Sequence, residues 1–593
     1  MNRARIGAAW AEAKAHLLEC RSPEGCWRGR LSSSALSTAT AVSALSLGAE
    51  AADAPLIRGG IGWLARVQNP DGGWGDTTDS PSNLSTSLLV QAALRLGRAE
   101  AAAGEMGARL EGYLCREAGT ASDERREAVC AAYAPDRTFA VPILTNLALA
   151  GLMPWEGIPS LPFELAAMPP ALFRFLRLHV VSYALPALIA VGLALDRHQA
   201  PRGRVRRWIR GASAKVALQK LRDIQPSSGG FLEAVPLTSF VAMSLAPIFG
   251  SGHPVVHKCL DFLRASARAD GSWAIDSDLS VWLTTAATVA LAESHGIGDS
   301  GATRAWILRA QHARRHPYTD SAAGGWAWTD LPGGVPDADD TAGALLAMAR
   351  LGERGPALDA GARWLLNLQN ADGGWPTFCR GWGHLPFDRS APDLTAHALR
   401  ALHALDPEFR RPDFRRAKAR GLRFLHDRMR ADGSWLPLWF GSQRTADHSN
   451  PVIGTARVLR ALAEIEPHGD CARRGRRFLL ESQNPDGGWG ASAGVASTTE
   501  ETALAVSALA NPGPTGAPDA VERGAAHLAG RVESGAWLQP APIGLYFARL
   551  WYSEEAYPAI WTVEALGRVL TRGGATPSLN GGKRVDPRVV QQG

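Results

Sequence analysis

A Gly-x-Trp motif recurs along the chain at intervals near 50 residues, and this repeat limits the folds that the chain can adopt. From Trp273 to Trp537, successive tryptophans of the motif lie 53, 49, 60, 54 and 48 residues apart. A helical pattern precedes each copy, and an Ala- and Leu-rich helical pattern follows it. The Asp-Gly step before most copies predicts a tight turn between the two helices. The tryptophans of the motif are Trp27, Trp74, Trp273, Trp326, Trp375, Trp435, Trp489 and Trp537.

Two helices in each repeat unit predict an array of helical hairpins. With so many copies, we expect the array to close into rings of inner and outer helices, which makes the fold class all-α. Several copies carry a Gln six residues before the Trp, at Gln68, Gln369 and Gln483. We expect these Gln and Trp side chains to join the end of one hairpin to its neighbour, which is a structural role. The stretch from about residue 100 to 230 lacks the motif.

The segment Asp337-Ala-Asp-Asp340 places three carboxyl groups within four residues, directly before a helical pattern that begins at Thr341. Because like charges this close cannot all ionise without cost, at least one of these acids should stay protonated. The positive end of the helix dipole favours the conjugate base that remains after a proton departs. The segment therefore suits a Brønsted acid. An Asp-rich N-cap on a surface helix and a divalent-metal loop explain the same residues, and these alternatives stay open.

Composition and charge argue against several classes of protein. The net charge of +6 is modest for 593 residues, and the basic clusters at 202–210 and 410–420 are not joined to a recognisable nucleic-acid-binding module, so we expect no nucleic-acid partner. The seven cysteines include no Cys-x-x-Cys pair, which disfavours a disulfide framework and a thiolate zinc site. They favour a reducing, cytoplasmic setting. The first ten residues have no continuous apolar core, so we expect no secretory signal.

Together, the Gln and Gly-x-Trp repeats and Asp337-Ala-Asp-Asp-Thr-Ala342 resemble the squalene–hopene cyclase family of class II terpene cyclases. The resemblance covers nearly the whole chain and is strongest from about residue 324 to 489. It implies two α/α barrels in the βγ-type arrangement, one inserted in the sequence of the other, with the active cavity between them. We expect a catalytic barrel from residues 1–29 and 236–575, a second barrel from residues 30–235, and a disordered tail from 576 to 593.

The resemblance also implies catalytic and substrate-binding residues. Asp339 matches the acid that protonates the terminal alkene, and Asp337 and Asp340 match its flanking acids. His397 matches the histidine that hydrogen-bonds the proton donor and helps to reload it. Aromatic faces would stabilise the carbocation without offering a lone pair, although spacing alone leaves simple core packing open for them. The implied substrate-binding aromatics are Trp328, Phe378, Trp439 and Tyr183.

The sequence departs from the family pattern at several positions. Two glutamates that squalene–hopene cyclases associate with the terminating water appear here as Ala39 or Thr40 and as Leu89. A cavity tryptophan at the domain junction falls near residues 237–238, and the stretch 196–225 is shorter than in the family. These changes leave open the substrate length and whether the last step is deprotonation or hydration.

We predict proton-initiated cyclisation of a linear terpenoid, with squalene and a hopene-type pentacycle as the first choice. A shorter or aryl-bearing polyprenoid, or a prenyl diphosphate, is the alternative within the class; ring number and stereochemistry stay open. Since squalene has no diphosphate and the proton comes from a side chain, we expect no metal and no cofactor. A protein-prenyltransferase β-subunit would need an Asp-x-Cys zinc pair, which is missing. A non-catalytic lipid-binding barrel would not need the three acids and His397.

Residues 150–212 form the segment that we expect to face a membrane. They include apolar, Pro-interrupted runs followed by Arg204, Arg206 and Arg207, which resembles a surface that enters one leaflet and contacts anionic headgroups. Residues 180–195 are too few for a spanning helix. We expect monotopic or peripheral attachment at the cytoplasmic face, with a soluble cytoplasmic protein as the alternative. The expected partners are a linear isoprenoid lipid and the membrane surface, and the sequence leaves open whether the protein is a homodimer.

Overall fold

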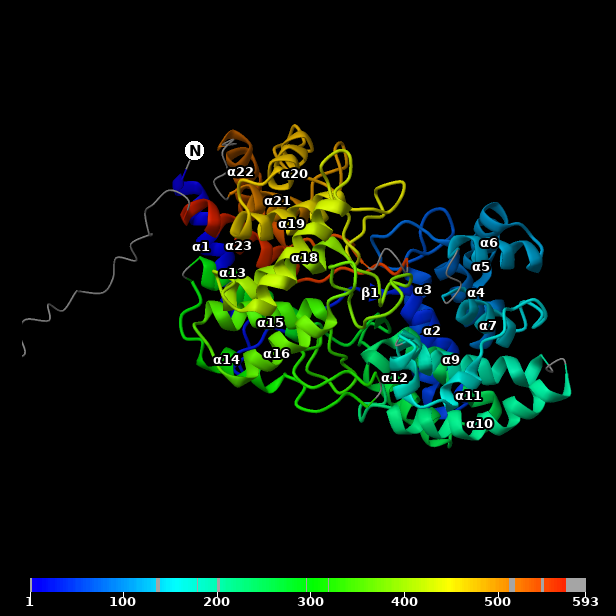
Figure 1. Cartoon of the computed structure of the whole chain (residues 1–593). Helices are drawn as coiled ribbons and strands as arrows, with labels where there is room; N and C mark the ends of the chain where they lie inside the picture. Colours follow the sequence, from blue (N-terminus) through cyan, green and yellow to red (C-terminus); the bar gives the residue numbers. More distant parts are fainter. Residues whose placement is uncertain are drawn as a thin grey trace, which may run out of the picture.

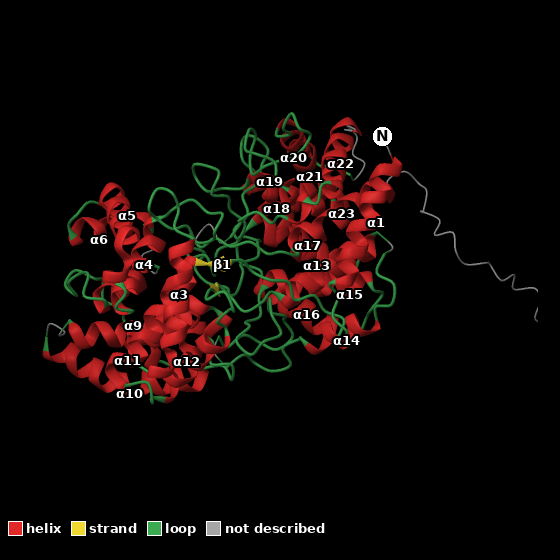
Figure 2. Ribbon diagram, turned by 180° about the vertical axis from the view of Figure 1, so that it is seen from behind, coloured by secondary structure: helices red, strands yellow, loops and turns green. Residues whose placement is uncertain are grey.

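The structure, a computed structural model, describes residues 3–134, 139–178, 180–199, 203–294, 296–317, 319–510, 518–544 and 549–571. The predicted tail at 576–593 lies outside the described residues. The helices form two bodies side by side, with the short strands β1 (Ser33–Ser34) and β2 (Trp273–Ala274) between them (Figures 1 and 2). These strands pair antiparallel, with Ser33 opposite Ala274.

One body, which we call the C-terminal barrel, has an inner and an outer layer of helices. Each inner helix contacts the next, and the last contacts the first, so the ring is closed. The inner helices are α13 (Ser280–Glu293), α15 (Ala338–Arg350), α17 (Pro392–Leu405), α19 (Pro451–Ile465), α21 (Thr499–Leu509) and α23 (Tyr557–Thr571). The outer helices are α14 (Gly301–Arg309), α16 (Pro356–Leu368), α18 (Pro412–Arg428), α20 (Asp470–Glu481), α22 (Pro518–Glu533) and α1 (Arg3–Glu19).

The other body, the N-terminal barrel, repeats this plan. Its inner helices also contact one another in a closed ring. They are α2 (Ala35–Gly48), α4 (Leu84–Leu96), α7 (Ala140–Leu149), α9 (Val180–His198) and α11 (Val235–Phe249). The outer helices are α3 (Ala54–Arg66), α5 (Glu100–Ala118), α6 (Ser122–Ala132), α10 (Arg204–Ile224) and α12 (Pro254–Ala265). The prediction of an all-α fold with two α/α barrels is confirmed.

The domain boundary differs from the predicted position at 235/236. Helix α11 contacts α2 and α9, and α12 contacts α11, so both helices belong to the N-terminal barrel. The buried core of this barrel takes in residues from Ala35 to Trp273, together with Val335, Phe378 and Cys379 from the junction, whereas Val281 already belongs to the other core. The chain therefore returns to the C-terminal barrel between β2 and α13. An apolar inner helix such as α11 suits either barrel, and only its packing partners decide which one it joins.

The repeat turns have the structural role that the sequence predicts. In one copy, the indole N–H of Trp375 donates to the carbonyl of Leu365 at 2.8 Å, and its backbone N–H donates to Thr395 Oγ1 at 3.0 Å. Gln369 Nε2 donates to the carbonyl of Gly373 in its own turn and to that of Ala417 on the next outer helix. The predicted link between neighbouring hairpins is confirmed for this copy.

The first glycine of this turn is needed for close approach between hairpins. Gly373 has φ of +93°, and a Cβ there would lie 2.5 Å from the carbonyl oxygen of Arg420 on α18. A side chain would therefore be strained by both its backbone conformation and this contact. The Asp-Gly-Gly sequence is thus required by the packing of outer helices against one another.

A degenerate copy of the turn lies at the end of the stretch that lacks the sequence motif. Gln225 Nε2 donates to the carbonyls of Gly229 and Val255, and the backbone N–H of Phe231 donates to Thr238 Oγ1. Phe231 is fully buried in the position that Trp holds elsewhere. The sequence search missed this copy because it relied on the tryptophan.

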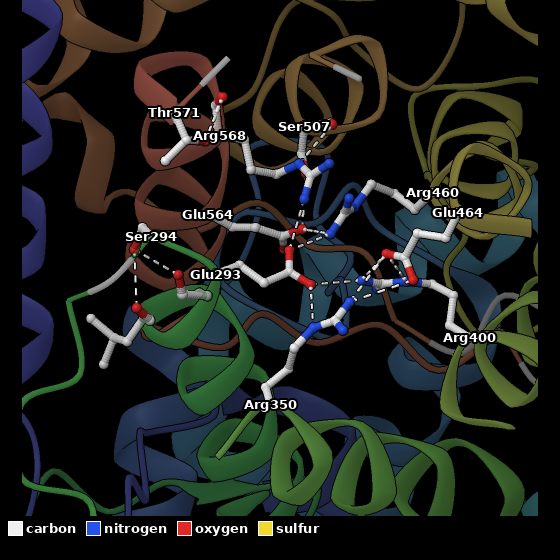
Figure 3. A network of polar contacts seen from close by, with 12 residues as sticks. Glu293, Ser294, Arg350, Arg400, Arg460, Glu464, Ser507, Glu564, Arg568 and Thr571 are labelled. Atoms are coloured by element: carbon white, nitrogen blue, oxygen red, sulfur yellow. Dashed lines mark hydrogen bonds and ion pairs between the residues drawn. The ribbon is translucent and has the colours of Figure 1, made fainter. Parts of the chain in front are cut away.

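A cluster of charged side chains lies near the C-terminal ends of the inner helices of the C-terminal barrel (Figure 3). Glu293, the last residue of α13, accepts from Arg350, Arg400, Arg460 and Arg568 at 2.8–3.1 Å. Burial would raise the pKa of Glu293, but the guanidinium groups outweigh it and hold that pKa well below its usual range. Glu464 and Glu564 complete this arginine–glutamate cluster.

The segment expected to face a membrane carries several exposed apolar side chains. Phe175 is 82% exposed, Val205 72% and Trp208 75%. Trp382 from the C-terminal barrel is also exposed, and its Nε1 donates to the carbonyl of Leu176 at 3.2 Å. In the part of the chain that the structure describes, no helix is both long and apolar enough to cross a membrane.

The basic cluster at 202–210 is only partly a surface feature. Arg204 is exposed, but Arg210 is buried and pairs with Asp196 at 2.9 Å, so Arg210 is not available to a membrane surface. The side chains of Arg206 and Arg207 lie outside the described part of the structure.

Candidate active site

The acidic segment begins helix α15 and is tied to two repeat turns. Asp337 is the N-cap, and its Oδ1 accepts the backbone N–H of Asp340 at 2.9 Å. The helix starts at Ala338, so Asp339 and Asp340 lie in its first turn. The backbone N–H of Asp337 donates to Trp326, and that of Ala338 donates to Thr377. The segment is therefore fixed at the end of the barrel that faces the N-terminal barrel.

Asp339 is held by two basic side chains from neighbouring inner helices. His397 Nδ1, on α17, lies 2.6 Å from Asp339 Oδ1. Arg457 Nη2, on α19, donates to Oδ1 at 2.8 Å and to Oδ2 at 3.1 Å. Asp339 itself is only 8% exposed. The structure thus brings together Asp339 and His397, as predicted, and adds Arg457.

The three acids have different pKa values because they have different neighbours. Burial raises the pKa of Asp337 to about 7, and burial together with the charge of Asp337 raises that of Asp340 well above its usual range. Burial also acts on Asp339, but the charges and hydrogen bonds of Arg457 and His397 outweigh it and lower its pKa. The flanking acids therefore hold protons to higher pH than Asp339 does.

A fourth carboxyl group lies one turn before His397 on α17. Asp393 is fully buried, and its Oδ2 has no hydrogen-bond partner in the structure. Burial raises its pKa to about 6. The charge of Arg457 opposes this rise, and the like charge of Asp339 adds to it. The site can thus hold several protons close to Asp339.

Three of the predicted aromatic residues form one cluster beside the acidic segment. The Phe378 ring lies 6.1 Å from that of Trp328 and 5.9 Å from that of Trp439, both in edge-to-face geometry. Trp439 Nε1 donates to Thr377 Oγ1 at 2.8 Å. Trp439 also contacts the cores of both barrels. These rings therefore lie where the two barrels meet, which suits a pocket between them.

A second aromatic cluster surrounds the basic side chains and was not predicted. Trp282 lies edge-on to His397 with centroids 6.4 Å apart, and Phe440 lies 6.1 Å from Trp282. The Arg457 guanidinium lies 5.4 Å from the Trp282 ring and 5.2 Å from the Phe440 ring. Trp561 continues the cluster to α23. The sequence feature that could have identified Arg457 as a site residue is its charge within the apolar pattern of an inner helix.

The other predicted site features fall elsewhere. Tyr183 is on α9, and its side chain lies outside the described part of the structure. Ala39, Thr40 and Leu89 are buried in the N-terminal barrel. Across the described residues, no group of three or more His, Cys, Asp or Glu side chains is arranged to hold a metal ion.

Two sequence-family profiles match the chain. The squalene-hopene cyclase C-terminal domain matches residues 279–571, and the squalene-hopene cyclase N-terminal domain matches residues 10–112. The first match contains the acidic segment, His397 and Arg457. It begins beside the start of α13, in agreement with the domain boundary that the packing gives.

Individual relatives agree with these matches. The squalene–hopene cyclase of Alicyclobacillus acidocaldarius is 25% identical over 80% of this chain and 90% of that protein. The drimenyl diphosphate synthase of Streptantibioticus cattleyicolor is 30% identical over 46% of this chain and 50% of that protein. The chain spans about half the length of several other curated relatives that it matches.

Among solved structures, the ent-copalyl diphosphate synthase from Streptomyces platensis superposes with a TM-score of 0.60 and 22% identity. The superposition covers 96% of this chain and 100% of that chain. It supports the fold of two helical barrels.

Proposed function

Because this chain belongs to the squalene–hopene cyclase family of class II terpene cyclases, we propose that it catalyses the proton-initiated cyclisation of a linear terpenoid. The observation that carries this proposal is the contact of Asp339 with both His397 and Arg457 inside a buried, aromatic-lined site. The three side chains come from adjacent inner helices, so the barrel itself sets their positions.

Asp339 is the proposed proton donor. The π electrons of the terminal double bond form a new C–H bond with the carboxyl proton, and the electron pair of the O–H bond stays on the carboxylate. The remaining cation is then attacked by the next double bond to close a ring. Because Arg457 and His397 stabilise the carboxylate, the protonated form is a strong acid, which an unactivated alkene requires. His397 would return the proton after turnover.

The aromatic clusters would guide the cation and keep it dry. A carbocation next to water is quenched, so the pocket must exclude water. Trp328, Phe378 and Trp439 offer ring faces and edges without a strong nucleophile, and a desolvated cation–π contact contributes about 2 kcal/mol. Several rings could therefore close in succession before the cation is lost.

Squalene is the proposed substrate, and a hopene-type polycycle is the proposed product. The names of both matching profiles and the family-like positions of Trp328, Phe378 and Trp439 support this choice. A prenyl diphosphate is the second candidate, favoured by the 30% identity to a drimenyl diphosphate synthase. Ala39 or Thr40 and Leu89 stand where squalene–hopene cyclases have glutamates associated with the terminating water, which favours a different last step.

Product analysis tests the function. Purified protein is incubated with squalene, geranylgeranyl diphosphate or farnesyl diphosphate, and extracts are analysed by mass spectrometry before and after phosphatase treatment. We expect polycyclic isomers from squalene, formed equally well in excess EDTA. Cyclisation of a diphosphate alone would support the second candidate. No cyclic product from any of the three would contradict the proposal.

We further propose that the protein binds peripherally to anionic membranes at the cytoplasmic face through exposed apolar side chains of the segment 150–212. The large exposures of Phe175, Val205 and Trp208 support this, as does Trp382, which is hydrogen-bonded to Leu176 beside Phe175. Arg204 stands beside them and would contact acidic headgroups. A water-insoluble substrate also needs such an entry.

Vesicle flotation tests the membrane proposal. We expect wild-type protein to float with anionic vesicles, and Phe175→Ser with Trp208→Ser to abolish flotation. Replacing Arg204, Arg206 and Arg207 by Glu should weaken it. Val216→Ser, another exposed apolar position on α10, is the matched control and should leave it unchanged. Full activity on dispersed substrate without binding to any vesicle would favour a soluble enzyme.

A further inference from the structure

Arg457 has an unusual position for a basic residue, because its side chain lies against two aromatic rings and is largely buried. Its side chain is 14% exposed. The rings of Trp282 and Phe440 both lie within 5.4 Å of its guanidinium carbon. Nη2 contacts both oxygens of Asp339 and lies 3.4 Å from His397 Nδ1. These contacts leave the guanidinium little freedom to move away from the acid.

The two oxygens of Asp339 are not equivalent. Oδ1 has two nitrogen neighbours, His397 Nδ1 at 2.6 Å and Arg457 Nη2 at 2.8 Å, whereas Oδ2 has only the longer contact with Arg457 at 3.1 Å. With the His397 proton on Nδ1, Oδ1 accepts two N–H groups and has no lone pair left for a proton of its own. A proton on this carboxyl group therefore belongs on Oδ2.

Among the described groups that face Asp339, Arg457 is the one that stays positively charged at every pH at which the protein would be assayed. Asp337 and Asp340 stand beside it on α15, and burial raises the pKa of both. From α17 come Asp393 and His397, and burial lowers the pKa of His397. Tyr552 and Tyr557 approach Asp340 from the α23 side, and burial raises the pKa of both. A neutral imidazole would stabilise the carboxylate only weakly, so the permanent cation matters.

We propose that Arg457 is a positioning residue that holds the transferable proton of Asp339 on Oδ2. By stabilising the carboxylate that remains, it makes Asp339 acidic enough to protonate unactivated double bonds. This inference rests on the proposed function. When the proton leaves, the Oδ2–H bond breaks and its electron pair stays on the carboxylate, which Arg457 already contacts through both oxygens. An alkene carbon receives the proton. In a terminal epoxide the oxygen receives it instead, and the C–O bond then opens.

The distinction between these two acceptors provides the test. An epoxide oxygen is far more basic than an alkene, so a weaker acid can still open it. Wild type, Arg457→Met and Arg457→Lys are compared with a linear polyprenoid that ends in a double bond and with the same chain ending in an epoxide. We expect Arg457→Met to lower alkene cyclisation at least 100-fold and epoxide cyclisation less than 10-fold. Arg457→Lys, which keeps the charge, should restore part of the alkene activity.

A matched control lies one turn further along the same helix. Arg460→Met removes a guanidinium from the arginine–glutamate cluster and does not touch Asp339. We expect it to lower the melting temperature and leave the alkene-to-epoxide ratio unchanged. Arg457→Gln keeps a hydrogen-bond donor without the charge, and it replaces the methionine variant if that variant does not fold.

Several results would overturn the inference. Equal losses on both substrates in Arg457→Met would show a merely structural role, and unchanged alkene turnover would show no role at all. A wild-type protein that cyclises neither substrate would instead refute the proposed function, and this inference with it. A ratio that shifts in Arg460→Met as much as in Arg457→Met would assign the effect to barrel stability.

Discussion

The imidazole Nδ1 of His397 lies 2.6 Å from Oδ1 of Asp339, although 58 positions separate the two residues in sequence. The contact exists because α15 and α17 are neighbours in the inner ring and both begin at the same end of the barrel. His397 is therefore fixed by helix packing rather than by a loop. It can orient the carboxyl group and pass a proton to it without a change of backbone.

Asp339→Asn should remove turnover. The amide is nearly the same size but cannot deliver a proton, and no other group has its contacts with His397 and Arg457. We expect less than about one percent of wild-type cyclisation, which corresponds to an increase of at least about 2.7 kcal/mol in the activation free energy. Steady-state product formation measures this, with circular dichroism to check the fold. Asp359→Asn, at a surface position, is the control. Activity above that level would refute the assignment of the donor.

His397→Ala should reduce turnover severely without abolishing it. Arg457 still holds both oxygens of Asp339, so the acid keeps one of its two positioning contacts. We expect activity that is clearly above that of Asp339→Asn and well below that of wild type. Single-turnover and steady-state rates measured side by side should show the larger loss in steady state, because reloading of the acid is also impaired. Equal losses in both regimes would argue against a reloading role.

The two kinds of aromatic residue should respond differently to truncation. Phe378→Ala or Trp439→Ala removes a ring from the pocket cluster, so the cation is lost earlier and products with fewer rings should appear. Trp375→Ala or Trp489→Ala removes a fully buried repeat tryptophan and should lower the free energy of unfolding by about 3–5 kcal/mol without changing the products. Gas chromatography with mass detection and denaturant titration separate the two effects. The same product pattern in both groups would show that the pocket lies elsewhere.

Glu293→Gln should destabilise the C-terminal barrel strongly. Its carboxylate contacts four guanidinium groups, and its removal leaves buried positive charges without their shared partner (Figure 3). Breaking a buried ion pair from one side costs about 3–5 kcal/mol. Thermal or urea unfolding measures the loss. Arg477→Gln, which removes an exposed pair with Glu481, should change stability little and serves as the control. An effect no larger than that of the control would contradict a structural role for the cluster.

Stability should fall as the pH rises from about 4.5 to 8. Burial raises the pKa of Glu554 from 4.5 to about 8. A folded-state pKa above the unfolded value gives a stabilising contribution that is complete below about pH 4.5 and is lost as the pH rises through 8. The loss reaches about 1.4 kcal/mol per pH unit for one group. Glu554→Gln keeps the acceptor oxygen but cannot ionise, so its melting temperature should decline less steeply. Parallel curves for the two proteins would contradict the assignment.

The barrel architecture could be predicted because its determinants are local. The Asp-Gly-Gly-Trp turn at Trp375 needs a glycine at positive φ, a buried indole and a Gln that reaches the next hairpin, and all of these occur within a few residues. The same holds for the acids, since Asp337 caps the helix on which Asp339 lies. The domain boundary could not be predicted in this way, because the apolar pattern of α11 suits either barrel and only its contacts with α2 and α9 place it.

The sequence by itself determined the helical hairpins and the identity of the acidic segment, because turn geometry and helix capping act between residues that are close in the chain. Only the tertiary structure decided the environment of the acid. Arg457 is 118 positions from Asp339, and a charged residue on an inner helix can face the barrel axis or a neighbouring helix. Which of these it faces depends on how α19 is rotated in the ring, and that rotation is set by the packing of all the inner helices together.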